Sequence, residues 1–244
     1  MKTKFLYSLV LLFLVLFSCE KDGNIDENNE TNGKTTAVFN SDLTYGSLTD
    51  QDGNVYKTIK IGSQTWMAEN LRTTIYNDGT AIKLITDESI WLNDWKSYKD
   101  GAYCNYNNTK NIDTIATYGK LYNAYTLKSG KLAPKGWHVS TADDWGTLKS
   151  FIGYTLGDKM KEKGDKHWKG QSPGSNETGF TALAGGRRNN YGFESIDFEA
   201  NWWIYTLEAD TICPFVQIHA DYAGFDISNE DKNVGLSVRC VKDN

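Results

Sequence analysis

The chain reads Trp137-His138-Val139-Ser140-Thr141-Ala142-Asp143-Asp144-Trp145 near its middle, and this stretch predicts a strand that leads directly into a helix. Ser140 with Asp143, or Thr141 with Asp144, has the spacing of a capping box, in which a hydroxyl and an acid satisfy the first free amide groups of a helix. Acidic residues at this point also suit the positive end of the helix dipole. The most clearly marked helix of the chain therefore begins here.

The residues that follow give this helix one apolar face and a defined end. Trp145, Leu148 and Ile152 stand at positions i, i+3 and i+7, which lie along one side of a helix. Gly153 is a natural terminator, because glycine readily adopts the backbone angles that close a helix.

The rest of the chain predicts one more helix and several short strands. The second helical pattern covers residues 118–128, with Leu121 and Tyr125 facing inward. Asp52-Gly53 predicts a hairpin turn ahead of a strand with alternating residue types. Strands are expected at residues 55–61, 180–184, 202–207, 215–219 and 236–241. Two helices among short strands indicate an α+β fold.

The N-terminal residues predict an export signal that ends at a cysteine. Lys2 and Lys4 precede an apolar run at residues 5–17, which is shorter than the roughly 20 residues of a membrane-spanning helix. Cys19 follows at once, and the pattern resembles a bacterial lipoprotein signal, in which the cysteine is lipidated. We predict a signal peptide over residues 1–18 and a membrane anchor at Cys19.

Residues 19–41 predict a disordered tether. Asn, Asp, Glu, Gly and Thr dominate this segment, and such a composition buries too little apolar surface to offset its chain entropy. In the Bacteroidetes lipoproteins that this start resembles, an acidic stretch with lysine, here Glu20-Lys21-Asp22, directs export to the cell surface. We expect an outer-membrane lipoprotein at the cell surface, or otherwise on the periplasmic face. The folded domain then covers residues 42–244.

Charge and composition limit the partners of the mature chain. Removal of the signal deletes Lys2 and Lys4, so 26 − 2 = 24 basic residues face 31 acidic residues. The resulting charge of about −7 disfavours nucleic acid and anionic lipid surfaces, which need a basic footprint. Aromatic residues make up 13% of the chain, and they either build a rigid core or line a binding face.

Metal-binding patterns are missing from the sequence. The acidic segment at residues 50–54 does not continue as an EF-hand loop, which needs Gly at its sixth position and Glu at its twelfth. Those positions hold Val55 and Ile61. No cysteine pair has zinc-ligand spacing, and the three histidines are scattered: His138, His167 and His219. We therefore expect neither a metal nor another cofactor.

Six blocks of sequence resemble, in the same order, the Fibrobacter succinogenes major paralogous domain family. They cover residues 52–62, 64–71, 118–123, 134–141, 178–187 and 235–241. The family is typical of exported and surface lipoproteins. Residues 137–145 and 235–240 are also similar to two stretches of formylglycine-generating enzymes. Those enzymes have the C-type lectin-like fold, so the resemblance implies that fold, with two main helices, short antiparallel strands and long loops.

The same resemblance bears on the cysteines. Family members often carry a cysteine just before the Pro-x-Gly-Trp-His block, where this chain has Ala133. An odd number of cysteines remains after the anchor, so one thiol is left unpaired. The candidate bridges are then Cys104–Cys240 and Cys213–Cys240, and the sequence does not choose between them.

The family's framework blocks suggest which tryptophans are structural. Trp66, Trp137 and Trp145 each stand in such a block, and we expect all three in the core. Trp137 and Trp145 should belong to one cluster at the start of the main helix. His138 is expected to be a hydrogen-bonded structural histidine rather than a catalytic base.

The sequence favours a binding protein over an enzyme. Neither a Gly-x-Ser-x-Gly elbow nor a Walker loop occurs. Cys213 and Cys240 do not match the redox pair of the formylglycine-generating enzymes, and the Glu-Pro-Asn and Trp-Asn-Asp motifs of calcium lectins are missing. We expect a non-enzymatic role in binding or adhesion, with a glycan or a protein as ligand. The alternatives are an accessory protein in carbohydrate processing and an enzyme with an unrecognised site.

One aromatic and basic group is the candidate ligand platform. It consists of Trp202, Trp203, Tyr205, Arg187 and Arg188, which could stack on a sugar or a peptide. Adjacent residues of a strand face opposite sides, so at most one of the two tryptophans is expected to point inward. The other interpretation is structural, with one tryptophan in the core and the other covering a loop.

Overall fold

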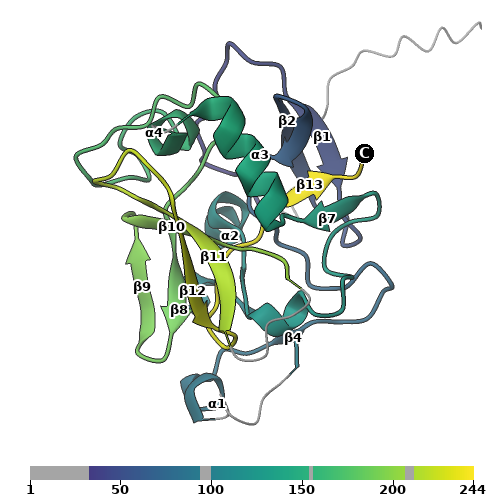
Figure 1. Ribbon diagram of the computed structural model, residues 1–244. Helices are drawn as coiled ribbons and strands as arrows, with labels where there is room; N and C mark the ends of the chain where they lie inside the picture. The colour runs from purple at the N-terminus through teal and green to yellow at the C-terminus, as the bar shows by residue number, and fades with distance from the viewer. Residues whose placement is uncertain (1–32, 94–99, 154–155, 207–211) are drawn as a thin grey trace, which may run out of the picture.

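Mostly antiparallel strands and two longer helices make up the computed structural model, which describes residues 33–93, 100–153, 156–206 and 212–244 (Figure 1). The predicted α+β class is confirmed. The signal peptide, the anchor at Cys19 and most of the predicted tether lie outside the described residues.

The largest sheet has five strands in the order β1-β2-β3-β13-β7. These strands are β1 (Gly46–Thr49), β2 (Val55–Ile61), β3 (Gln64–Met67), β13 (Cys240–Lys242) and β7 (Trp137–Val139). Strand β13 lies between β3 and β7, because Val241 pairs with both Trp66 and His138. The C-terminal strand β13 therefore joins β3 and β7, which are far apart in sequence, into one sheet.

Smaller sheets and short helices complete the fold. Strands β10 (Glu199–Trp203), β11 (Ile212–His219) and β12 (Asp226–Asp231) form an antiparallel sheet, β4 (Lys83–Leu84), β5 (Ala102–Cys104) and β6 (Leu121–Tyr122) a mixed one, and β8 (Gly185–Asn189) and β9 (Gly192–Ile196) a hairpin. The helices are α1 (Glu88–Asn93), α2 (Ile112–Tyr118), α3 (Ala142–Ile152) and α4 (Leu156–Met160), with 3₁₀ turns at Tyr106–Asn108 and Ala124–Thr126.

The main predicted helix is confirmed as α3. Of the two capping alternatives, the structure has Thr141 with Asp144: the Asp144 amide donates to Thr141 Oγ1 at 3.3 Å, and the Thr141 amide donates to Asp144 Oδ2 at 2.8 Å. Trp145 and Leu148 are buried on the face that packs against the five-stranded sheet. Gly153 is the C-cap, as its position predicted.

The second predicted helix, at residues 118–128, is wrong. Helix α2 ends at Tyr118, where the predicted helix was to begin. Its C-cap, Gly119, has φ +76° and lies so close to Asn70 that a Cβ would be 2.6 Å from the Asn70 side chain. Tyr122 then exchanges two backbone hydrogen bonds with Leu236, so the chain is extended here. Leu121 is buried, but Tyr125 is only half-buried.

The predicted strands are partly confirmed. Strand β2 and its turn appear as predicted, and residues 215–219 lie in β11. Residues 180–184 form no strand, because Thr181 has φ +54° and only Ala182 makes an isolated bridge. Strand β10 ends at Trp203, and within residues 236–241 only the last two belong to β13.

The core is rich in aromatic rings. Trp66, Trp145, Phe180 and Trp202 form one cluster between α3 and the sheets, with the Trp66 and Trp145 ring centroids 4.9 Å apart. The buried guanidinium of Arg239 lies 4.1 Å from the centroid of the Phe180 ring. Edge and tilted contacts of this kind add to the stability gained from burial alone.

The end of the predicted tether lies on the domain. Residues 34–40, here called the N-terminal strap, donate backbone hydrogen bonds to side chains of the domain, including Val38 N to the buried Glu162 carboxylate. The Glu162 carboxylate also bonds the buried His167 ring at 2.6 Å. The assignment of residues 34–40 to a disordered tether is therefore corrected, since this strap has partners far away in sequence.

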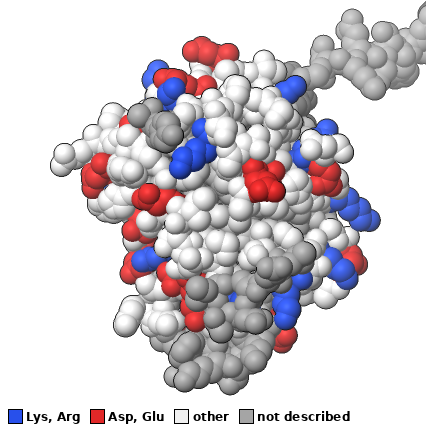
Figure 2. Space-filling view, viewed as in Figure 1, with Lys and Arg blue, Asp and Glu red and all other residues white. Residues whose placement is uncertain are grey.

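The surface in Figure 2 carries acidic and basic side chains interspersed over the face shown. Within the described part of the chain, no helix has the length and apolar character needed to cross a membrane.

Candidate functional site

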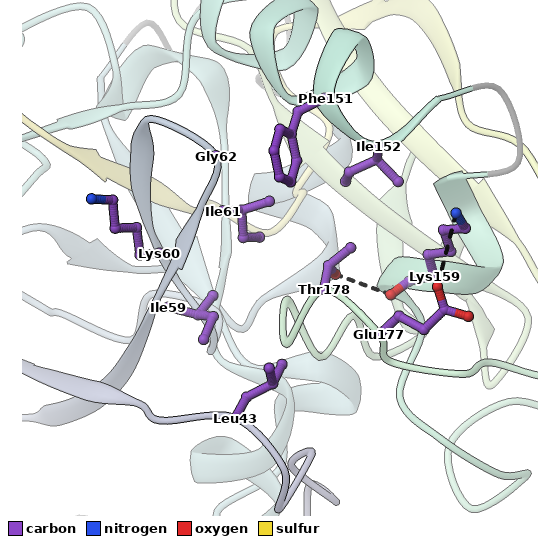
Figure 3. Close-up of a pocket in the computed structure, with 10 residues that line it drawn as sticks. All are labelled: Leu43, Ile59, Lys60, Ile61, Gly62, Phe151, Ile152, Lys159, Glu177 and Thr178. Atoms are coloured by element: carbon purple, nitrogen blue, oxygen red, sulfur yellow. Dashed lines mark hydrogen bonds and ion pairs between the residues drawn. The ribbon is translucent and has the colours of Figure 1, made fainter.

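A groove of about 290 Å³ lies where the turn between β2 and β3 meets the ends of α3 and α4 (Figure 3). Its lining consists of Leu43, Ile59, Lys60, Ile61, Gly62, Phe151, Ile152, Lys159, Glu177 and Thr178. The groove thus draws on five segments that the fold brings together.

The floor of the groove is apolar and one wall is an exposed ring. Ile59 and Ile61 are buried strand residues, whereas Phe151 is 66% exposed. Figure 3 shows the Phe151 ring extending from α3 toward Ile61. A Cβ on Gly62 would meet this ring at 3.0 Å, so the ring lies directly over the glycine backbone. Phe151 therefore offers an apolar surface that the core does not need.

The other end of the groove is polar. The Lys159 ammonium lies 3.8 Å from Glu177 Oε2, and both side chains are exposed. The Thr178 hydroxyl donates to the Lys159 carbonyl at 3.0 Å, which fixes the loop to α4 (Figure 3). An apolar floor with an adjustable polar rim suits a ligand that has an apolar face and hydrogen-bonding edges.

The predicted platform is not an exposed surface. Trp202 and Trp203 are both fully buried, so our expectation of at most one inward tryptophan is wrong. Strand β10 passes between two core clusters, and the Trp202 ring lies 5.6 Å from Phe180 while the Trp203 ring lies 6.5 Å from Phe215. Both indole N–H groups donate to buried acceptors.

The two arginines of that platform also interact with other residues of the fold. Arg188 is buried, and its guanidinium lies 4.3 Å from the Trp91 ring and donates to the Ile85 carbonyl at 2.8 Å. Arg187 is partly buried and forms an ion pair with Glu194 at 2.7 Å. Tyr205 is half-buried. The structure therefore does not gather the five predicted residues on one accessible face.

The three cysteines among the described residues are buried free thiols, so neither candidate bridge, Cys104–Cys240 nor Cys213–Cys240, is present. Burial raises the pKa of Cys104 to about 11 and also raises the pKa of Cys213 and Cys240. A thiol with a raised pKa is a poor nucleophile, because the thiolate is the reactive form.

The framework residues are mostly where the sequence predicted. Trp66 and Trp145 are fully buried neighbours, but Trp137 is only partly buried and packs against the other cluster. The prediction that Trp137 and Trp145 share one cluster is wrong. Trp137 is on β7, and its side chain packs on the opposite side of the sheet from Trp145. His138 is hydrogen-bonded as predicted, at 2.7 Å to Asp243 and 3.0 Å to Asp144.

A second, charged cavity of about 260 Å³ was not predicted. Its lining consists of Asp52, Asn54, Arg72, Thr74, Ile112, Ile115 and Lys120. The sequence did contain a sign of this cavity. Lys120 lies inside one of the family-like blocks and Arg72 directly follows another, and a basic residue is unusual in a block that forms the core framework. For the groove, the sign in the sequence was Phe151, a large aromatic residue of the main helix that lies off the buried face of Trp145 and Leu148.

Groups of three or more His, Cys, Asp or Glu side chains that could hold a metal ion do not occur among the described residues. Neither a curated protein nor a solved structure matches the chain. Residues 59–242 match the family described as the Fibrobacter succinogenes major domain. Because this match covers most of the sequence, the chain belongs to the Fibrobacter succinogenes major domain family.

Proposed function

We propose that this chain is a lipid-anchored, non-enzymatic binding protein whose ligand occupies the groove of Figure 3. The anchor is Cys19, and the location is the outer membrane, with the domain at the cell surface or otherwise on its periplasmic side. The C-type lectin-like fold is part of this proposal, supported by the resemblance of residues 137–145 and 235–240 to enzymes with that fold.

The observation that carries the proposal is the exposed ring of Phe151 above an apolar floor. An exposed aromatic ring beside an apolar floor can cover the apolar face of a ligand. The rim supplies both charge signs through Lys159 and Glu177, which suits the hydroxyl groups of a glycan. We therefore favour a glycan as ligand, and a protein is the other outcome of the test.

The test is binding of residues 20–244 to glycan and protein arrays, with calcium and with a chelator. We expect glycan binding that does not depend on calcium and that Phe151→Ala lowers at least tenfold. Tyr191→Ala is the matched control, because Tyr191 is 93% exposed on the turn between β8 and β9, outside the groove. The proposal fails if Phe151→Ala and Tyr191→Ala retain the same binding.

A further inference from the structure

Two buried cations line the charged cavity. Arg72 is 6% exposed and Lys120 is 8% exposed, and both line the same 260 Å³ space. Cations are rarely buried unless other groups pair with them, so the partners of these two decide what the cavity can accept.

The Arg72 guanidinium is only partly satisfied by the described residues. Its Nη2 donates to the Val55 carbonyl at 2.7 Å, but buried Nε and Nη1 have no hydrogen-bond acceptor there. The Glu69 carboxylate is 3.6 Å from Nη1, which is an ion pair longer than a hydrogen bond. A buried donor without an acceptor is unfavourable, so an additional acceptor at this point is stabilising.

Lys120 adds donors to the same cavity. Its ammonium donates to Asn105 Oδ1 at 3.2 Å, and an ammonium has three N–H groups in all. Burial lowers the pKa of Lys120 to about 8. The groups that act on it electrostatically are Asp52, Arg72, Cys104 and Asp50. An anion beside Lys120 would stabilise its charged form.

The remaining lining defines the shape and charge of the occupant. Ile112 and Ile115 of α2 add apolar side chains to the lining. The Asp52 carboxylate at the rim, which accepts from the Thr74 hydroxyl at 2.8 Å, repels a second negative charge. One anionic group with an apolar substituent fits both features. We propose that this cavity binds a small organic monocarboxylate, with the carboxylate at Arg72 and Lys120 and the apolar part against α2.

This site is separate from the groove of Figure 3, and its test does not depend on the proposed function. The experiment is an NMR titration of residues 20–244 with sodium isobutyrate, its neutral isostere isobutyramide, and inorganic phosphate. We expect saturable shifts at the Asn54 and Thr74 amides with isobutyrate, with a Kd on the order of millimolar for so small a probe. Isobutyramide and phosphate should bind at least tenfold more weakly.

The variants separate binding from packing. Lys120→Met keeps an unbranched side chain without charge and should weaken isobutyrate at least tenfold, whereas Lys128→Met, at an exposed lysine, should change nothing. Isobutyrate binding to the parent should also fall as the pH rises through about 8, where Lys120 loses its proton. If Lys120→Met does not fold, Asp52→Asn serves instead, and it should admit phosphate.

Three results would overturn the assignment of a carboxylate site. The first is equal binding of isobutyramide and isobutyrate, and the second is unchanged binding in Lys120→Met. The third is the lack of any saturable shift at Asn54 and Thr74 with isobutyrate.

Discussion

Trp202 and Trp203 are adjacent in sequence but pack in opposite core clusters, so each substitution should lower the stability of the fold. We expect Trp202→Ala and Trp203→Ala each to lower the free energy of unfolding by about 3–5 kcal/mol, through lost burial and a cavity. Phe151→Ala should cost under about 1 kcal/mol, because the ring is largely exposed. Urea melts measure all three, and a Trp202→Ala protein as stable as Phe151→Ala would contradict the burial.

His138 gives the fold a small pH dependence. Burial alone would lower the pKa of His138, but its hydrogen bonds with Asp243 and Asp144 outweigh burial and raise the pKa above the usual value. A raised folded pKa stabilises the fold below the unfolded value of about 6.5, and this contribution is lost as the pH rises through the folded pKa.

The variant His138→Gln removes the charge but keeps a hydrogen-bonding side chain. Its deficit in unfolding free energy should be larger at pH 5.5 than at pH 8.5. The difference should stay under about 1 kcal/mol, because the ring is 39% exposed and solvent screens the pairs. Equal deficits at the two pH values in urea melts would show that the ion pairs contribute nothing.

The N-terminal strap is the element that most departs from its sequence pattern. Its apolar residues are Ala37, Val38 and Phe39, and the polar contact of Val38 N reaches the buried Glu162, whose carboxylate bonds the His167 ring. We expect Glu162→Leu to release the strap, because the Val38 amide loses its acceptor. Limited chymotrypsin digestion should then cut after Phe39 at least tenfold faster.

A matched control distinguishes release of the strap from general loosening. Glu88→Leu changes an exposed glutamate at the start of α1 and should leave the cutting rate at Phe39 unchanged. If Glu162→Leu resists digestion as well as the parent does, the hydrogen bond from Val38 N to Glu162 is not what keeps the strap on the domain.

Local chemistry explains which elements the sequence predicts. Thr141 and Asp144 cap α3 through groups three residues apart, and Asp52-Gly53 turns between strands that pair with each other, so each signal is complete within a short window. The second helix was misplaced because Gly119 and the pairing of Tyr122 with Leu236 depend on contacts distant in sequence.

The candidate site could not be predicted from short stretches of sequence, because it too depends on contacts distant in sequence. The alternation rule for strands assumes one buried face, and it failed at Trp202 and Trp203 because β10 is covered on both sides. The groove and the charged cavity each combine residues from segments far apart in the chain, such as Arg72 and Lys120. Their residue types are visible in the sequence, but their proximity is not.

The molecule as a whole holds together without a disulfide among its three buried thiols. We expect its melting temperature to be the same with and without a reducing agent. Iodoacetamide at pH 8 should not label the folded protein, since burial raises the pKa of Cys104 to about 11 and blocks access. Three thiols should react in urea; a single reactive thiol under those conditions would reveal a bridge.

The predicted anchor is tested on the complete chain in its host membrane. Cys19 is the only cysteine that directly follows the apolar run of the signal. We expect Cys19→Ala either to leave the membrane fraction or to remain as uncut precursor, whereas Cys104→Ala should fractionate as the parent does. Normal processing and membrane retention of Cys19→Ala would rule out the lipid anchor.

The central position of β13 makes the order of synthesis matter. Strands β3 and β7 are hydrogen-bonded into one sheet only through residues 240–242. A ribosome or a translocation pore that handles the chain from its first residue therefore deals with an unfinished sheet until residue 242 has emerged. On the export route that we propose, such late closure would leave the chain unfolded while it passes through the translocation channel.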